Sequence, residues 1–118
     1  MTKILITEDS SFQRRNIRAM LNNAGYETEE AENGKKALLK LERDIPDGIL
    51  VDLLMPEMNG FDLLSVLREK YPDIPTIVVT SDIQETTYQQ CLDLGAKAII
   101  NKPVNKEKLI ASLKQLIV

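Results

Sequence analysis

Histidine and tryptophan are absent from this chain of 118 residues, and cysteine occurs once, as Cys91. A single cysteine excludes an intramolecular disulfide framework, and the lack of imidazole excludes most zinc sites and any triad or general base built on histidine. Cys91 falls in a segment of helical periodicity, where we interpret it as a small apolar side chain. The chemistry of this chain must therefore use carboxylates, hydroxyls, lysine or a hard metal ion.

Long apolar runs and a large net charge are also missing. No stretch approaches the roughly 20 residues needed to span a bilayer. The start, Met1–Ile4, lacks the apolar region and small-residue cleavage site of a signal peptide. The net charge is −3, which provides no broad basic surface for nucleic acid. We expect a cytoplasmic protein with no membrane insertion and no nucleic acid as its primary partner.

What the chain does contain is an ordinary globular balance of 43% apolar and 28% charged residues. This balance and the length predict one domain over residues 1–118. Five strand-like segments are predicted at Ile4–Ile6, Tyr26–Glu30, Ile49–Val51, Thr76–Thr80 and Ala98–Ile100. A helical pattern follows each of them, at about 11–23, from 34 onward, and at about 60–70, 84–94 and 106–117.

Strict alternation of strands and helices predicts an α/β fold, a doubly wound parallel sheet with helices on both faces. Burial on both faces explains why four strands are continuous apolar runs, while the charged Tyr26–Glu30 segment suits a sheet edge. We expect the flavodoxin-like (βα)5 arrangement with strand order 2-1-3-4-5, in which the first and third strands are neighbours.

The first helix is predicted to begin after a cap at Ser10 or Ser11. Its apolar side is expected to consist of Phe12, Ile17, Met20, Leu21 and Ala24. Three arginines form a basic strip on the same helix: Arg14, Arg15 and Arg18. We interpret this strip as a solvated face, with a docking surface for an acidic partner as the alternative.

Acidic side chains follow two of the apolar strands, with Glu8 and Asp9 after the first and Asp52 after the third. If these strands are neighbours, three carboxylates converge, and each pair repels by ~1 to 4 kcal/mol at effective dielectric constants of 80 to 20. Either one pKa rises so that a proton stays bound, or the site binds a cation. Lys102 supplies one positive charge, which leaves about −2, the charge that a divalent ion cancels. Oxygen ligands alone favour Mg²⁺, or Mn²⁺, over zinc.

The fourth strand ends in hydroxyl side chains, Thr80 and Ser81. Together with the acids and Lys102, they match what a phosphoryl group requires: cations and a hydroxyl for its oxygens, and a carboxylate that can attack phosphorus. An ionised carboxylate needs no general base. The residues therefore favour formation of an aspartyl phosphate on Asp52.

These motifs, in this order and at the predicted strand ends, resemble receiver domains of two-component response regulators over essentially the whole chain. The residues that carry the resemblance are Ile4–Asp9, Asp52–Pro56, Asn59–Gly60, Thr80 and Lys102–Pro103. The resemblance implies that Asp52 accepts a phosphoryl group from a histidine kinase or a histidine phosphotransfer protein. It also implies that the domain is a signalling switch and not an enzyme. The reactions that it would catalyse are its own phosphorylation and dephosphorylation.

The resemblance further assigns roles within the site. Asp9 and Asp52 would bind Mg²⁺ directly, Leu54 through its backbone carbonyl, and Glu8 through water. Thr80 and Lys102 would hold phosphoryl oxygens, and the Lys102–Pro103 peptide bond would be cis. A kinase would dock beside the site at Ser10, Gln13 and Asn16.

One position departs from the family pattern, because Ile99 stands where the fifth strand usually carries an aromatic switch residue. We expect the signal to pass through Ser81, Asp82 and the following helix, with Ile99 and Pro103 in the switch region. The exposed face of the fourth helix and fifth strand is the expected output surface for a downstream protein. Leu54 and Asp82 flank the path of attacking water and are expected to set the phosphoryl lifetime.

Several functional alternatives stay open. A stand-alone receiver without an output domain, which we expect, suits a chemotaxis-type regulator or a phosphorelay intermediate, acting as a monomer or dimerising on activation. An aspartate-nucleophile phosphatase would carry a second Asp at the position of Leu54, and an FMN binder would need a Ser/Thr/Gly-rich first loop. A pseudo-receiver that is never phosphorylated is disfavoured by the intact set of site residues.

Overall fold

A computed structural model describes residues 1–55 and 58–117 of the chain, so Pro56 of the family-like motif lies outside the described residues. Within them the strands are β1 (Lys3–Thr7), β2 (Glu27–Ala31), β3 (Gly48–Asp52), β4 (Thr76–Thr80) and β5 (Ala98–Asn101). The helices are α1 (Ser11–Asn23), α2 (Gly34–Arg43), α3 (Gly60–Lys70), α4 (Glu85–Asp93) and α5 (Lys106–Leu116). Each strand is followed by its helix, as the alternating pattern predicts.

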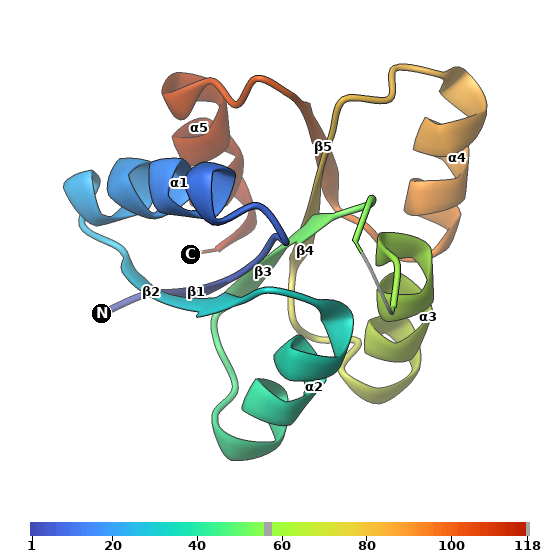
Figure 1. The fold of residues 1–118 in the computed structure, drawn as a ribbon, viewed down its shortest axis with the longest axis horizontal. Coiled ribbons are helices and arrows are strands. Elements are labelled where there is room, and N and C mark those ends of the chain that lie inside the picture. Colours follow the sequence, from blue (N-terminus) through green and yellow to red (C-terminus); the bar gives the residue numbers. More distant parts are fainter. Residues whose placement is uncertain (56–57, 118) are drawn as a thin grey trace.

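All neighbouring strands run parallel, in the order β2-β1-β3-β4-β5. This confirms the predicted flavodoxin-like fold and the edge position of β2. The register pairs Thr7 with Val51 and Thr80 with Asn101. Because the strands are parallel and in register, the residues that follow β1, β3, β4 and β5 emerge at the same edge of the sheet (Figure 1).

The sheet is covered by α1 and α5 on one face and by α2, α3 and α4 on the other (Figure 1). Alternation along each strand divides the core between the faces: Ile4 and Ile6 pack with α1 and α5, whereas Leu5 packs with α2 and α3. The three central strands are therefore buried on both sides, which is why their sequences are continuous apolar runs. No helix in the described part of the chain has the length and apolar character required to cross a bilayer.

Side-chain caps mark the starts of four helices. Ser10, the cap of α1, accepts a hydrogen bond from the Gln13 backbone N–H at 3.3 Å, which decides between the two predicted serines. The same role is taken by Asn33, Asn59 and Asn105 at α2, α3 and α5. Each such cap is worth about 1 kcal/mol. The cap of α1 directly follows the acidic pair and so contributes to its placement.

The expected apolar side of α1 is wrong at both of its ends. Ile17 and Leu21 are buried, but Phe12 is 66% exposed and Ala24 is exposed beyond the last turn. Five residues of an α-helix correspond to a rotation of roughly 140° relative to the starting direction. Phe12 therefore cannot share the inward direction of Ile17.

Candidate functional site

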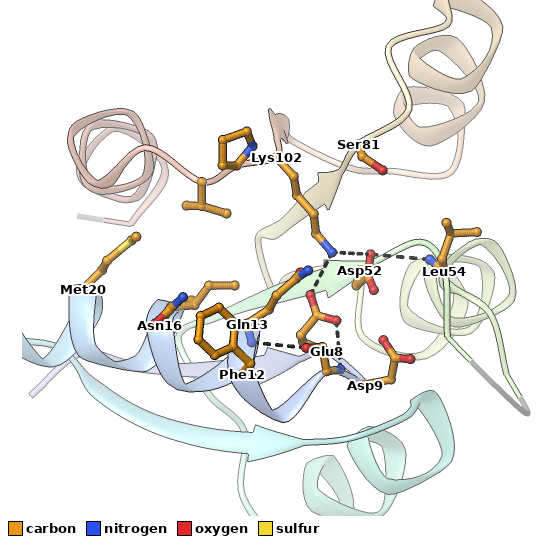
Figure 2. Close-up of a pocket in the computed structure, with 14 residues that line it drawn as sticks. Glu8, Asp9, Phe12, Gln13, Asn16, Met20, Asp52, Leu54, Ser81 and Lys102 are labelled. Carbon is orange, nitrogen blue, oxygen red and sulfur yellow. Dashed lines mark hydrogen bonds and ion pairs between the residues drawn. The ribbon is translucent and has the colours of Figure 1, made fainter.

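The carboxyl ends of β1, β3 and β5 bring Glu8, Asp9, Asp52 and Lys102 together in a pocket of about 650 Å³. Figure 2 shows Lys102 reaching from the end of β5 to Glu8 and Asp52. The pocket continues past the acids along α1 to the loop after β5. Its other lining residues are Ser10, Phe12, Gln13, Asn16, Ile17, Met20, Leu54, Ser81, Pro103 and Val104.

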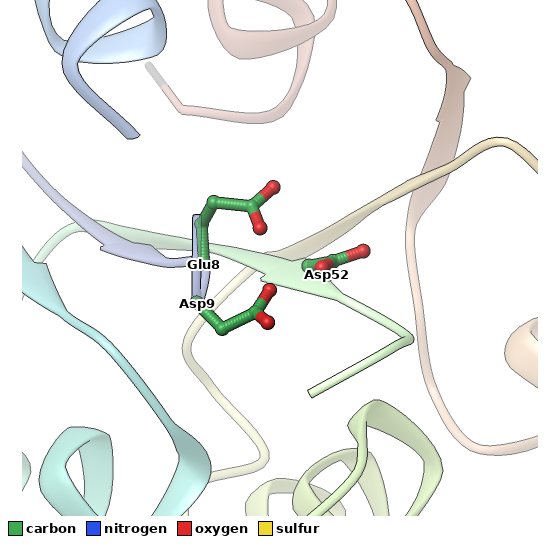
Figure 3. Close-up of side chains that lie close together, drawn as sticks. All are labelled: Glu8, Asp9 and Asp52. Atoms are coloured by element: carbon green, nitrogen blue, oxygen red, sulfur yellow. The ribbon is translucent and has the colours of Figure 1, made fainter. Parts of the chain in front are cut away.

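The three carboxylates converge from neighbouring strands. Glu8, Asp9 and Asp52 each offer an oxygen, and these atoms lie within 4.8 Å of one another (Figure 3). Mg²⁺ holds its oxygen ligands at about 2.1 Å in octahedral geometry, so two of its ligands lie at most about 4.2 Å apart. Neighbouring ligands lie about 3.0 Å apart, so the three carboxylates are close enough to share one ion once side-chain rotation brings their oxygens nearer to one another. The donor set, carboxylates without imidazole or thiolate, suits a hard cation such as Mg²⁺ or Mn²⁺.

Lys102 supplies the compensating positive charge. Its Nζ donates to Glu8 Oε1 at 3.0 Å and to Asp52 Oδ1 at 3.3 Å. Burial lowers the pKa of this ammonium group, but the hydrogen bond to Glu8 and the charges of Asp52 and Glu8 outweigh that effect and raise it overall. Lys102 is therefore a fixed cation at neutral pH. The peptide bond between Lys102 and Pro103 is cis, as the resemblance implied.

Glu8 is the most strongly perturbed acid of the site. Glu8 is only 2% exposed, and this burial is the main reason why the pKa of its carboxyl is raised to about 7. The hydrogen bond and negative charge of the Asp52 carboxyl raise that pKa further, while Lys102 and the Ser10 backbone N–H oppose the shift. Both remedies for crowded carboxylates, proton binding and cation binding, are thus available at this position.

The loop after Asp52 is supported by the start of α3. The Gly60 backbone N–H donates to the Leu53 carbonyl oxygen at 2.9 Å. A Cβ atom at Gly60 would lie 2.5 Å from Leu53 Cα and 2.7 Å from the Asp52 carbonyl oxygen. This explains the glycine of the Asn59–Gly60 pair, because only a residue without Cβ lets the start of α3 approach the Asp52 loop this closely. Leu54 projects outward, 74% exposed, and lines the pocket.

The predicted hydroxyls take different positions. Thr80 is 2% exposed, and its Oγ1 accepts a hydrogen bond from the Asp82 backbone N–H at 3.1 Å. Ser81 is exposed and lines the pocket. The Asp82 carboxylate accepts from the Gln84 N–H and from the Thr87 hydroxyl, which lower its pKa. Asp82 is thus tied to the start of α4.

Two features of the switch region were not predicted from the sequence. Ile99 is half-buried and packs against a cluster that includes Val78 and Cys91. The hydroxyl of Tyr88, on α4, donates to Asn101 Oδ1 at the end of β5. The sequence shows that both side chains can form hydrogen bonds, but it does not show that these two positions, on different elements, lie next to each other.

Comparisons with known proteins agree with this geometry. The family model described as the response regulator receiver domain matches residues 4–114. The chemotaxis protein CheY of Thermotoga maritima is 31% identical over 115 residues, which make up 97% of this chain and 96% of that protein. Protein PilH of Pseudomonas aeruginosa is 33% identical over 119 residues, covering 99% of this chain and 98% of PilH.

Longer relatives and solved structures match as well. The chain spans about half the length of the response regulators named MprA, such as that of Mycolicibacterium vanbaalenii, for which the covered share is 50% at 31% identity. The structure of chemotaxis protein CheY4 of Vibrio cholerae superposes with a TM-score of 0.93 at 32% identity, covering 99% of both chains.

Proposed function

The chain belongs to the response regulator receiver domain family, and we propose that it is a signalling switch driven by phosphorylation of Asp52. The observation that carries this proposal is the buried Asp52 carboxylate, 5% exposed and 3.3 Å from the ammonium group of Lys102, beside the acids Glu8 and Asp9. A nucleophile, a fixed cation and a set of oxygen ligands are the parts that phosphoryl transfer to a carboxylate requires.

In the proposed reaction an Asp52 carboxylate oxygen attacks the phosphorus of a phosphohistidine on the donor. The new O–P bond forms as the P–N bond breaks, and the electron pair of that bond stays on the imidazole nitrogen, which takes up a proton. No general base is needed, because a carboxylate nucleophile has no proton to lose. Lys102 would turn its ammonium group from Glu8 to a phosphoryl oxygen, and the developing charge would favour this contact.

Thr80 is suited to a second phosphoryl contact. Its oxygen accepts from Asp82, so its own proton remains available for donation to a phosphoryl oxygen. Asp9, Asp52, the backbone carbonyl of Leu54 and, through water, Glu8 would hold the metal. Bound Mg²⁺, or Mn²⁺, would neutralise charge on the transferring phosphoryl group.

The donor is proposed to be a histidine kinase or a histidine phosphotransfer protein that docks on the pocket along α1. Polar Ser10, Gln13 and Asn16 lie beside the acids, while exposed Phe12 extends the same surface as an apolar contact. An exposed aromatic rimmed by polar groups is typical of a protein interface. A cytoplasmic location is part of this proposal.

The output is proposed to be a contact with a downstream protein on the face formed by α4 and β5. Phosphorylation would move Thr80 and Ser81 toward the phosphoryl group. Asp82 would transmit this movement to α4, because its backbone N–H is bound to Thr80 and its carboxylate to Thr87 of α4. Ile99 and Pro103 border this path on β5 and in the loop after it. A chemotaxis-type regulator and a phosphorelay intermediate both fit, as does a monomer or a dimer formed on activation.

Incubation with acetyl phosphate and Mg²⁺ tests the proposal by intact-mass spectrometry. The protein should gain one phosphoryl group that hydroxylamine removes, and Asp52→Asn should abolish the gain. Asp73→Asn, which alters an exposed aspartate in the turn before β4, is the matched control and should behave as wild type. Full labelling of Asp52→Asn would refute the assignment, and sustained phosphate release from unrelated esters would favour a phosphatase.

A further inference from the structure

Arg14 of α1 makes two polar contacts that connect β2 with the acidic pair. Its Nε donates to Glu30 Oε1 at 3.0 Å, and its Nη1 donates to the backbone carbonyl oxygen of Glu8 at 2.7 Å. Arg18 binds the other oxygen of Glu30 at 2.6 Å but makes no contact with Glu8 among the described residues. The arginine side chains are 17% and 41% exposed, respectively. Interpreting the basic strip of α1 as a solvated face is therefore wrong for Arg14.

The carbonyl that Arg14 contacts belongs to the peptide group that joins Glu8 to Asp9. The preceding peptide group is also held, because the Glu8 N–H donates to the Ala31 carbonyl oxygen of β2 at 3.1 Å. Both peptide planes around Glu8 are thus fixed to β2, one directly and one through the Arg14–Glu30 ion pair. A planar guanidinium with two donors in a fixed fork suits this bridging role.

Asp9 depends on this support more than Glu8 does. The Glu8 carboxylate has two partners of its own, Lys102 at 3.0 Å and the Ser10 N–H at 3.2 Å. The Asp9 side chain is exposed, and no hydrogen bond to it occurs among the described residues. The position from which the Asp9 side chain extends is therefore set by its backbone alone, and the Glu8–Asp9 peptide group is the part of that backbone held by Arg14.

We propose that Arg14 is a positioning residue for the metal site, which fixes the Glu8–Asp9 peptide group and thereby directs two of the three acidic ligands. This inference rests on the proposed function, because it concerns the same cation. Charge alone predicts the opposite effect: Arg14 repels a divalent ion, so its removal would tighten binding. The sign of the change therefore separates positioning from simple electrostatics.

Isothermal titration of the metal-free protein with Mg²⁺ tests the inference. Arg14→Met keeps the aliphatic stem and removes both donors, and it should weaken Mg²⁺ binding by about tenfold or more, in the range typical of groups that orient metal ligands. Arg18→Met removes a charge from the same Glu30 without touching Glu8, and it should stay within about twofold of wild type. Equal or tighter binding by Arg14→Met, or an equal loss in both variants, would overturn the proposal.

Two further measurements keep the test decisive. Arg14→Lys retains the charge and the stem but not the fork, so it should also bind Mg²⁺ more weakly, and it replaces Arg14→Met if that variant does not fold. Amide chemical shifts of Asp9 and Ser10 in the metal-free protein should move in the Arg14 variants and not in Arg18→Met. Absence of Mg²⁺ binding by wild type would contradict the proposed function itself, whereas wild-type binding with an unaffected Arg14→Met contradicts only the role of Arg14.

Discussion

The ammonium group of Lys102 lies 3.0 Å from a carboxylate oxygen of Glu8, although the two residues are 94 positions apart in the sequence. The same nitrogen also contacts Asp52 at 3.3 Å. In the metal-free protein Lys102 thus balances part of the charge that a divalent cation would otherwise cancel. A proton, the Lys102 ammonium group and a metal ion would each neutralise charge on these carboxylates. Metal binding at this site should therefore depend on pH.

Glu8 should make the stability of the metal-free protein depend on pH. Burial raises the pKa of its carboxyl from 4.5 to about 7, so between these values the folded protein holds a proton that the unfolded chain has released. The contribution is complete below 4.5 and is lost as pH rises through about 7. The free energy of unfolding of wild type, measured in urea, should fall relative to that of Glu8→Gln between these pH values. Parallel curves for the two proteins would contradict the assignment.

Mg²⁺ should stabilise the protein more at high than at low pH, because the cation and the Glu8 proton compete. The increase in melting temperature caused by a fixed Mg²⁺ concentration should therefore be larger at pH 8 than at pH 6. In Glu8→Gln the increase should be nearly independent of pH over this range. A wild-type increase that is the same at both pH values would exclude this linkage.

Gly60→Ala should disturb the loop that follows Asp52. The new Cβ would meet backbone atoms at 2.5 and 2.7 Å, which cannot move aside as a flexible side chain can. We expect a loss of about 1–3 kcal/mol in the free energy of unfolding, as for other overpacked sites, together with slower phosphorylation by acetyl phosphate.

Gly34→Ala is the matched control for Gly60→Ala. Gly34 also follows an asparagine cap at the start of its helix, but the three atoms nearest to its Cβ would be side-chain atoms of Met58, at 2.9 Å or more. Its cost should be smaller, and its phosphorylation rate should remain that of wild type. Equal effects of the two alanines on both measurements would show that the Asp52 loop is not specially dependent on Gly60.

Leu54 should lengthen the life of the phosphorylated form. It is 74% exposed and lines the pocket, so its apolar side chain would shield Asp52 from attacking water. Leu54→Asn should speed decay of the aspartyl phosphate severalfold, measured after acetyl phosphate is removed. Leu39→Asn, at a position 60% exposed on α2, should leave the decay rate unchanged. An unaltered rate in Leu54→Asn would remove Leu54 from this role.

Beryllofluoride with Mg²⁺ should shift the amide resonances of Ser81 and Asp82, and the chemical-shift changes should extend through α4 to Ile99. The expected route follows the hydrogen bonds from Thr80 to Asp82 and from Asp82 to Thr87. Asp52→Asn should show none of these changes. Shifts confined to Glu8, Asp9 and Asp52 would mean that the signal does not reach the proposed output face.

The alternation of apolar and amphipathic segments was sufficient to predict a parallel sheet, whereas the strand order was expected only by analogy with flavodoxin-like folds. It was also sufficient to expect Glu8, Asp52 and Lys102 at one edge, because strand direction determines where strand ends meet. Helical periodicity alone already separates Phe12 from the direction of Ile17, so the outward position of Phe12 could have been predicted. The inward turn of Arg14 could not, because it requires Glu30 on β2 as a partner, and helical periodicity carries no information about a neighbouring strand.

A crystal structure with Mg²⁺ and beryllofluoride would show directly whether Asp52 is the phosphoryl acceptor of a metal site. We predict one ion between Asp9 and Asp52, with the fluoride group on Asp52 contacted by Lys102 and Thr80. Carboxylates that point away from one another, with no ion between them and Asp52 unmodified, would contradict the account.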